Sequence, residues 1–386
     1  MVGYFTHDLI IHIIIFQTII LLVILSNIWL LHKARKHDPP PVYPMVSILV
    51  PARNEEKNIA SCILSLLVQD YPSFEVIVYD DQSSDATRSI LERIAREQPR
   101  LKIIVGNSLP EGRLGKNWAC AQLARQAKGD LLLFTDADTI YQPHALCSIV
   151  TALIGEQADL LTGFPRQEVC SWGERLLVPF FSWALYCFIP LVLAYKLRLT
   201  GLSGAIGQIM LFRREAYLMI GGHDSVSSSI IDDLLLARRI KAAGLRWRLM
   251  NIIDLVSCRM YPGSHAALNG FSKNLFAVFN FHLLVYLFTY LWLAVMFWEP
   301  LIILILSVTG HTPLAWVDEL ATCIGLSLLV WLIPYMDLGI PFYLASLYPF
   351  NIGFVEIAAF ESLRLTLGGR LTWKDRTLPK SHWKWF

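Results

Sequence analysis

The sequence has little net charge and few cysteines. Its formal charge is +2 over 386 residues, and the basic residues do not gather on one predicted face, so nothing indicates nucleic-acid binding. The seven cysteines are scattered and form no C-x-x-C pair, which predicts reduced thiols rather than a disulfide framework or a zinc site. What the sequence has in excess is apolar residues, at 55%, more than soluble proteins usually carry. The composition therefore predicts an integral membrane protein.

The first apolar run, from Leu9 to Leu31, is long enough for one membrane-spanning helix. It is too long for the core of a signal peptide, no Lys or Arg precedes it, and no small-residue cleavage site follows it, so a cleaved signal is disfavoured. Because the basic sequence HKARKHDPPP comes next, the positive-inside rule predicts an external N-terminus and a cytosolic remainder. We expect a transmembrane helix over residues 1–32 and a proline-containing linker over 33–44.

Apolar segments return in residues 275–360, roughly at 283–308, 320–333 and 342–360. Three crossings would place the C-terminus outside, whereas the basic tail, residues 361–386, belongs inside. We give the charge more weight. One segment is therefore expected to be re-entrant or interfacial, or the long first segment to fold as two.

The region between the apolar segments, residues 45–274, alternates predicted strands and helices like a globular domain. Strands are expected over Val46–Val50 and Val76–Tyr79 with a helix between them, which predicts a βαβ unit of an α/β fold. We expect Pro51 to end the first strand, and the second ends in the acidic sequence DDQSSDAT. Ligands of open α/β sheets bind beyond the carboxyl ends of the strands, so these ends are candidate ligand contacts.

The sequence GDLLLFTDADTI ends a third predicted strand with two carboxylates. Leu131 to Phe134 are consecutive apolar residues, as in a strand covered on both faces, and Asp136 and Asp138 follow at its tip. The alternative is a plain exit from strand to turn, where Asp is common. The first strand is also followed by acidic residues, in ARNEEKN. Three acidic strand ends in one crevice would repel one another unless cations and sugar hydroxyls share the site. In a D-x-D arrangement, one carboxylate binds Mg²⁺ or Mn²⁺ bridging a diphosphate.

The motifs VPARNEE, VYDDQSSDAT and FTDADT, in this order and spacing, resemble those of the family 2 glycosyltransferases over about residues 46–274. The resemblance implies the GT-A fold of nucleotide-diphospho-sugar transferases, a mostly parallel mixed sheet with helices on both faces. It also implies a nucleotide-sugar donor and a divalent metal, Mg²⁺ or Mn²⁺, at Asp138. The donor contacts that it implies are Pro51, Ala52, Glu55, Asp81, Lys116 and Asp136.

The resemblance also implies a catalytic base at the start of a helix, in SSIIDDLLLARR. The family usually has an ED pair there; in this chain Asp232 stands where the family has Glu, and Asp233 falls on the base position. The alternative is that both are ordinary acidic residues stabilised by the helix dipole. We keep Asp233 as the expected base, with His223 and Asp224 as the next candidates.

The chain lacks the Q-x-x-R-W motif of processive family members. The corresponding stretch is ALNGF, with Phe271 in the position of the Trp, so a polymer-threading synthase is disfavoured. The segments MYPG, NGFSKN, GLSGAIGQIMLFRREAY and LTWKDR resemble glycosyltransferases that act on carotenoids, hopanoids or ceramide-like lipids, most of all those of the diaponeurosporenoate type. UDP-glucose is the expected donor, although the sequence itself does not identify the sugar.

Residues 174–199 contain about twenty apolar residues and by hydropathy alone resemble a membrane span. A single crossing would separate Asp138 from Asp233, which are expected to serve one site. We therefore expect a helix broken near Pro179 and Pro190 that lies in the membrane interface. Its aromatic residues at headgroup depth would be Trp172, Trp183 and Tyr186. The alternative is an ordinary buried helix of the domain.

The leading hypothesis is a membrane-anchored enzyme that transfers one sugar, with inversion, from a nucleotide-diphosphate sugar to a lipophilic acceptor such as a carotenoid. Ceramide, diacylglycerol and hopanoid are alternative acceptors, and membrane lipids are expected partners. A membrane-tethered receiver-like regulator also fits VIVYDD followed by another strand-end Asp, but it would be complete well before Asp232. A transporter would not need the soluble α/β domain between its spans. The oligomeric state stays open.

Overall fold

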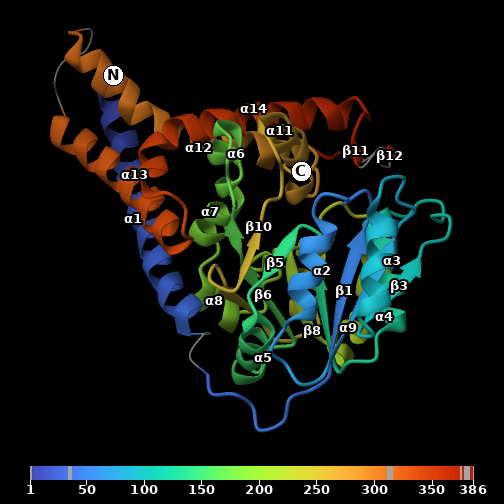
Figure 1. Ribbon diagram of the computed structural model, residues 1–386. Helices are drawn as coiled ribbons and strands as arrows, with labels where there is room; N and C mark the ends of the chain where they lie inside the picture. The colour runs from blue at the N-terminus through green and yellow to red at the C-terminus, as the bar shows by residue number, and fades with distance from the viewer. Residues whose placement is uncertain (1, 34–36, 311–315, 374–375, 378–382, 386) are drawn as a thin grey trace.

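The computed structural model describes residues 2–33, 37–310, 316–373, 376–377 and 383–385. An α/β domain forms the body of the molecule, and a group of long apolar helices projects from one side of it (Figure 1). The domain contains a seven-stranded sheet of order β3-β2-β1-β4-β8-β6-β9. Its strands are β1 Val46–Ala52, β2 Phe74–Asp80, β3 Leu101–Val105, β4 Leu131–Thr135, β6 Leu160–Phe164, β8 Ile209–Arg213 and β9 Trp247–Asn251.

The sheet is mostly parallel, as the sequence predicted. Only β8 runs antiparallel to its neighbours, β4 and β6. The first strand extends beyond its expected end, because β2 pairs with β1 as far as Ala52. The pairing of β4 with β1 ends at Leu49, so Pro51 breaks no ladder hydrogen bond on that side. The expectation that Pro51 ends β1 is therefore wrong.

Helices cover both faces of the sheet because its strands carry apolar residues on both sides. Along β1, Ile48 and Val50 face one core and Leu49 faces the other, as the two-residue period of a strand requires. The first core is closed by α2 Ile59–Leu67, α3 Thr87–Glu97 and α5 Ala145–Gly155. The second is closed by α4 Gly115–Gln126, α9 Arg214–Met219, η1 Gly222–Val226 and α10 Asp232–Ala242.

A small second sheet lies beyond the end of β4. Its strand order is β5-β10-β7, with β5 Thr139–Tyr141, β7 Arg166–Gln167 and β10 Val256–Cys258. The pairing of β10 with β5 brings Cys258 opposite Thr139, one residue after the second carboxylate of the D-x-D sequence. This sheet therefore forms one wall next to the acidic strand ends.

The apolar segment at 174–199 is broken where the sequence predicted. It folds as α6 Trp172–Leu177, α7 Pro179–Phe188 and α8 Leu191–Lys196, each too short to span a membrane. The strands on either side of the segment, β6 and β8, are hydrogen-bonded neighbours, so the chain returns to the sheet that it left. At the second break, the Asn27 side-chain amide donates to the carbonyls of Tyr186 and Ile189, which ties the break to the first helix.

The aromatic residues of this segment do not all lie as expected. Trp172 is exposed, but Trp183 and Tyr186 are buried. The Trp183 ring stacks on Trp331 with centroids 4.1 Å apart, and its Nε1 donates to the Val330 carbonyl. Trp183 and Tyr186 therefore pack against a C-terminal helix, and of the three residues only Trp172 is exposed at the surface.

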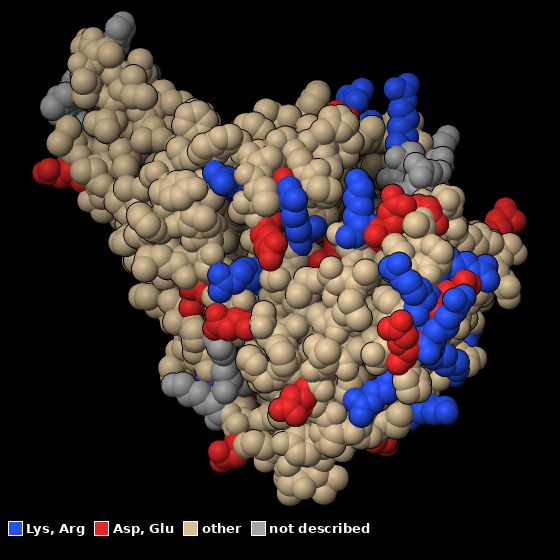
Figure 2. Space-filling model, viewed as in Figure 1, with Lys and Arg blue, Asp and Glu red and all other residues tan. Residues whose placement is uncertain are grey.

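Among the described residues, four helices are long and apolar enough to cross a membrane. They are α1 Val2–Lys33, α12 Leu283–Val308, α13 Val317–Asp337 and α14 Tyr348–Leu367, the last preceded by η3 Phe342–Leu347. On the face shown in Figure 2, the part of the molecule that α1, α12 and α13 form is almost free of charged side chains. Because α12 is one continuous helix, the expectation that this segment folds as two is wrong.

The helices have defined relative directions. α1 and α13 run parallel, since Gln17 donates to Ser327 near their middle and His32 contacts Asp337 at their ends. α14 instead lies against α12, where the Tyr286 hydroxyl donates to the Ala359 carbonyl, and it runs across the top of the view in Figure 1. Its second half thus lies beside the first turns of α12, which leave the domain. This arrangement favours α14 as the re-entrant or interfacial segment.

Candidate active site

The candidate donor residues lie at the carboxyl edge of the sheet. Pro51 and Ala52 end β1, and Asp81 directly follows β2. The Asp81 amide donates to the Ala52 carbonyl at 2.8 Å, and the Arg53 guanidinium donates to the Asp81 carbonyl at 2.6 Å. The two strand ends therefore form one short, hydrogen-bonded edge in which the Asp81 side chain is buried.

Lys116 reaches this edge from the first turn of α4. Its ammonium lies 2.6 Å from the Asp136 carboxylate, at the tip of β4. Burial alone would lower the pKa of Lys116, but the negative charges of Asp136 and Asp232 outweigh it and raise the pKa well above its usual value. The structure thus brings the lysine to both acidic pairs, and Lys116 stays charged between them.

Asp138 has the environment expected of a ligand for a cation. Its Oδ1 is buried and has no hydrogen-bond partner among the described residues. Burial, followed by the charges of Asp136 and Glu55, raises the pKa of Asp138 to about 7. A bare buried carboxylate oxygen is costly without a partner, so a hard divalent cation fits this position.

The chain itself would supply only part of a metal's coordination sphere. Within the described ranges, no cluster of three or more His, Cys, Asp or Glu side chains is suited to hold a metal ion. Mg²⁺ and Mn²⁺ sites commonly combine one or two carboxylates with substrate phosphates and water. The arrangement around Asp138 therefore fits a cation that binds together with a diphosphate.

Asp232 and Asp233 begin α10, as predicted, and have different environments. Asp233 accepts hydrogen bonds from two backbone amides, Gly207 N at 3.1 Å on Oδ2 and Leu234 N at 2.7 Å on Oδ1. Each oxygen keeps a free lone pair, because a carboxylate has about four acceptor sites. Burial raises the pKa of Asp233 despite these hydrogen bonds.

Asp232 is buried more deeply than Asp233, and its Oδ2 lies 3.7 Å from His223 Nε2. Burial raises the pKa of Asp232 to about 7, the charge of Lys116 opposes this rise, and the charge of Asp233 adds to it. Burial, with a contribution from Lys116, lowers the pKa of His223 to about 3. The histidine is therefore neutral near pH 7, and its contact with Asp232 is not an ion pair.

The two reserve candidates for the base have other contacts. His223 Nδ1 is 2.9 Å from the Tyr217 hydroxyl, so both ring nitrogens face protein groups. Asp224 is paired with Arg113 at 2.5 Å and with Arg125 at 2.7 Å. Neither side chain is as well placed as Asp233 to accept a proton from a substrate.

Sequence reasoning missed a chain of polar contacts behind Asp138. Gln167 donates to Gln208 Oε1 at 2.8 Å, and Gln208 Nε2 donates to Cys258 Sγ at 3.0 Å. Burial, followed by the charge of Asp138, raises the pKa of the Cys258 thiol well above its usual value, so the thiol lies near that carboxylate. Tyr261 also lies near the carboxylates, since burial and then the charges of Asp138 and Asp136 raise its pKa. The available signal was Gln208, a polar residue directly before the apolar run Ile209–Phe212.

Glu174 fixes the loop that carries Tyr261. Its side chain is fully buried and forms a capping box with Ser171 at the start of α6. Its Oε1 also accepts hydrogen bonds from Gly263 N at 2.7 Å and from Arg259 Nη2 at 3.2 Å. The loop leads into α11 Ser264–Ser272, where Phe271 is buried 5.5 Å from the Tyr261 ring. The aromatic residue in the position of the missing Trp is therefore part of this wall.

With this geometry in view, residues 47–220 match the family described as Glycosyl transferase family 2. The chain carries a family 2 glycosyltransferase domain. This match argues against the receiver-like and transporter alternatives. It also supports the interpretation of the acidic edge as part of a sugar-transfer site, because that edge is built by strands inside the matched residues.

Two curated relatives show the range of proteins that share this glycosyltransferase domain. A 4,4'-diaponeurosporenoate glycosyltransferase of Staphylococcus haemolyticus is 29% identical over 234 residues, which cover 60% of this chain and 60% of that protein. A beta-monoglucosyldiacylglycerol synthase of Trichormus variabilis is 30% identical over 225 residues, covering 57% of this chain and 44% of that protein. The chain thus matches less than two thirds of either relative.

A solved structure confirms the GT-A-like fold. A mannosyltransferase from Pyrobaculum calidifontis, in complex with GDP-Man and Mn²⁺, aligns with 92% of this chain and 99% of its own, with a TM-score of 0.50 and 19% sequence identity. At this identity the similarity shows the fold alone. The glycosyltransferase domain of this chain therefore has the expected architecture.

Proposed function

We propose that the protein is a glycosyltransferase that moves a single sugar from a nucleotide-diphosphate donor to a lipophilic acceptor held in a membrane. The observation that carries this proposal is the cluster at the carboxyl edge of the sheet, where Lys116 lies between two acidic pairs and Asp138 Oδ1 lacks a partner among the described side chains. The family 2 domain and the four apolar helices support it.

The donor would lie across the ends of β1 and β2, with its nucleoside against Pro51, Ala52, Glu55 and Asp81. Asp136 would contact the ribose, and Lys116 would place its charge near the donor. Asp138 Oδ1 would hold Mg²⁺ or Mn²⁺, as suggested by the Mn²⁺ in the mannosyltransferase complex. When bound, such a cation neutralises charge that develops on the leaving diphosphate.

Asp233 would act as the general base for the acceptor. Its two backbone hydrogen bonds fix the carboxylate and leave lone pairs free for a hydroxyl proton. The acceptor oxygen would attack the anomeric carbon from the face opposite the nucleotide, and its proton would pass to Asp233. The bond to the diphosphate would break with its electron pair on the leaving oxygen, so the anomeric centre would invert. A carboxyl acceptor, already ionised, would need no base.

The relatives and the membrane helices support the proposed class of acceptor. One relative is named for a carotenoid acid and the other for a glucosylated diacylglycerol, so we propose a lipophilic acceptor, a carotenoid first, with diacylglycerol, ceramide and hopanoid as alternatives. UDP-glucose is the proposed donor.

The proposed organisation of the chain begins with a transmembrane helix at 1–32 and a linker at 33–44. The catalytic domain at 45–274, with its interfacial segment at 174–199, lies in the cytosol. A membrane region at 275–360 and a tail at 361–386 follow.

The test is to express the full chain in a heterologous membrane, supply labelled UDP-glucose and other nucleotide sugars, and analyse the lipid extract by mass spectrometry. We expect lipids that carry one added hexose, because the chain lacks Q-x-x-R-W. The Asp138→Asn variant should lose Mn²⁺-dependent donor binding in calorimetry, whereas Asp70→Asn, an exposed carboxylate outside the site, should not. A ladder of hexose additions, or donor binding unchanged in Asp138→Asn, would contradict the proposal.

A further inference from the structure

A pocket outside the candidate active site lies at the opposite edge of the sheet from the acidic cluster. It has a volume of about 340 Å³ and lies between the end of α1, α8 and the first residues of β9. Arg248 of β9 pairs with Leu161 near the start of β6, at the amino edge of the parallel strands. The proposed transfer reaction does not use this pocket.

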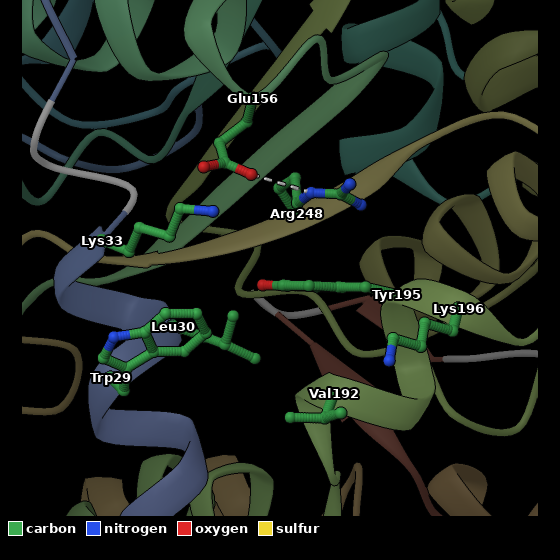
Figure 3. Close-up of a pocket in the computed structure, with 8 residues that line it drawn as sticks. All are labelled: Trp29, Leu30, Lys33, Glu156, Val192, Tyr195, Lys196 and Arg248. Carbon is green, nitrogen blue, oxygen red and sulfur yellow. Dashed lines mark hydrogen bonds and ion pairs between the residues drawn. The ribbon is translucent and has the colours of Figure 1, made fainter.

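The charges in the pocket are unbalanced. Arg248 is paired with Glu156 at 3.1 Å, and Glu156 also accepts from His37 at 2.9 Å. Lys33 and Lys196 line the same space and have no ion pair within the described part of the chain. Figure 3 shows Lys33 extending from the end of α1 toward the Glu156–Arg248 pair. The pocket lining therefore contains three cationic side chains and one carboxylate, which leaves an excess of positive charge.

The same pocket is continuous with an apolar stripe. Ile15, Ile19, Leu22 and Leu25 of α1 are between 50% and 63% exposed. Their spacing of three or four residues places them on one face of the helix. The next residue at this spacing is Trp29, which is 64% exposed and lines the pocket. Lys33 follows one turn later, with its ammonium 5.6 Å from the Trp29 ring centre.

The position of Lys33 along α1 matches the edge of a bilayer. The run from Leu9 to Leu31 contains no charged residue, and about 20 apolar residues span the hydrocarbon core. If α1 crosses the membrane, Lys33 lies at the level of the headgroups, where Trp and Lys side chains are common. The apolar stripe would then face the acyl chains, and the cations would face the headgroups.

We propose that this pocket binds the phosphate headgroup of an anionic glycerophospholipid. Lys33 and Lys196 contact the phosphate, Trp29 packs beside the glycerol, and an acyl chain lies along the stripe from Leu25 to Ile15. The proposal rests on the membrane crossing by α1 that the proposed function includes, but not on the transfer reaction. A lipid bound here would join α1, α8 and β9, and so hold the catalytic domain at the membrane surface.

The test uses the full chain purified in detergent and native mass spectrometry with added phosphatidylglycerol or phosphatidylcholine. We expect preferential retention of phosphatidylglycerol. The double variant Lys33→Gln, Lys196→Gln should retain it about thirtyfold less, since each of the two basic residues near a lipid surface contributes about 1 kcal/mol and about 1.4 kcal/mol corresponds to a factor of ten. The matched control is Lys102→Gln, Lys128→Gln, which removes two exposed cations outside the pocket. This control should retain the lipid as the unmodified chain does.

Three outcomes would overturn the proposal. The first is equal retention of both lipids by the unmodified chain. The second is retention of phosphatidylglycerol by the Lys33→Gln, Lys196→Gln variant that equals retention by the unmodified chain. The third is full displacement of the lipid by inorganic phosphate alone, which would indicate a site for free phosphate. Both lysines are exposed, so their replacement should leave the fold intact, and Mn²⁺-dependent donor binding checks this. If the unmodified chain retained phosphatidylglycerol but transferred no sugar, the proposed function would be contradicted and the lipid site would not.

Discussion

At the scale of single residues, the two adjacent acids of α10 are separated by their surroundings. Asp233 is fixed by two backbone amides, whereas Asp232 is deeply buried next to a neutral His223. We expect Asp233→Asn to reduce turnover by about 10²–10⁴-fold, the usual contribution of a general base, with donor affinity largely kept. Asp232→Asn should have a milder effect. Steady-state transfer to a hydroxyl acceptor, together with calorimetry of the donor, measures both.

The reverse result would change the assignment. If Asp232→Asn abolished turnover and Asp233→Asn did not, the deeper carboxylate would be the base and Asp233 a structural residue. Near-normal transfer by both variants would reduce the pair to an ordinary helix start. The control is Asp254→Asn, an exposed carboxylate, which should leave turnover unchanged.

The residues that sequence predicted and those that it missed differ in how the chain brings them together. Asp136, Asp138, Asp232 and Asp233 stand next to runs of apolar residues, so the local pattern marks them as ends of elements. Cys258 and Gln208 are 50 positions apart and meet only through a hydrogen bond between two sheets. No local pattern reports such a contact, and their part in supporting Asp138 could be found only from the structure.

At the scale of elements, Glu174 joins α6 to the loop before α11. Burial alone would raise its pKa, but hydrogen bonds from Cys170 N, Arg259 and Gly263 N outweigh burial and lower the pKa from 4.5 to about 2. A carboxyl group whose pKa is lower in the folded chain than in the unfolded chain stabilises the fold at pH values above its unfolded pKa. This contribution, about 3 kcal/mol, is therefore fully present above about pH 5. It should be lost as the pH falls from there towards 2.

We therefore expect Glu174→Gln to lower the midpoint of thermal unfolding of the full chain at pH 7 by several degrees, and to flatten its decrease between pH 5 and 3. Thermal unfolding in detergent across this pH range measures both effects. Glu168→Gln, an exposed carboxylate close in sequence, is the matched control. A Glu174→Gln variant with an unchanged midpoint and pH dependence would show that the capping box does not support the loop.

The ends of helices and strands could be predicted from the sequence only where the local pattern decides them and distant contacts do not. The predicted breaks near Pro179 and Pro190 were correct because each of these prolines stands where a new helix starts, at the first residue of α7 and directly before α8. Proline alone does not decide a break, since Pro300 lies inside the continuous helix α12. The end of β1 was misjudged because a proline is tolerated in a strand whose neighbour on one side has already ended. The burial of Trp183 depends on Trp331, which is far along the chain, so hydropathy alone could not distinguish a surface for lipid from a surface for another helix.

At the scale of the whole molecule, the path of the C-terminal helices bears on the conflict between the number of apolar helices and the positive charge of the tail. Three crossings after the domain would leave the basic tail on the far side. In the structure, the Phe276 amide donates to Ser362 of α14, and the Lys384 amide donates to the Phe281 carbonyl just before α12. The tail thus lies beside the residues that join the domain to the membrane region.

We therefore expect the domain and the tail to share one side of the membrane, opposite the connection between α12 and α13. The test uses single cysteines in a background without the other native cysteines: the exposed Cys170, Trp385→Cys and Thr309→Cys. In sealed inside-out vesicles, an impermeant maleimide should label Cys170 and Trp385→Cys but not Thr309→Cys, and right-side-out vesicles should give the reverse. Retained donor binding is the control for folding.

If Trp385→Cys were labelled together with Thr309→Cys, α14 would cross the bilayer and the tail could not contact the start of α12. Labelling of Cys170 only in right-side-out vesicles would instead place the catalytic domain outside the cell and exclude a cytosolic nucleotide-sugar donor.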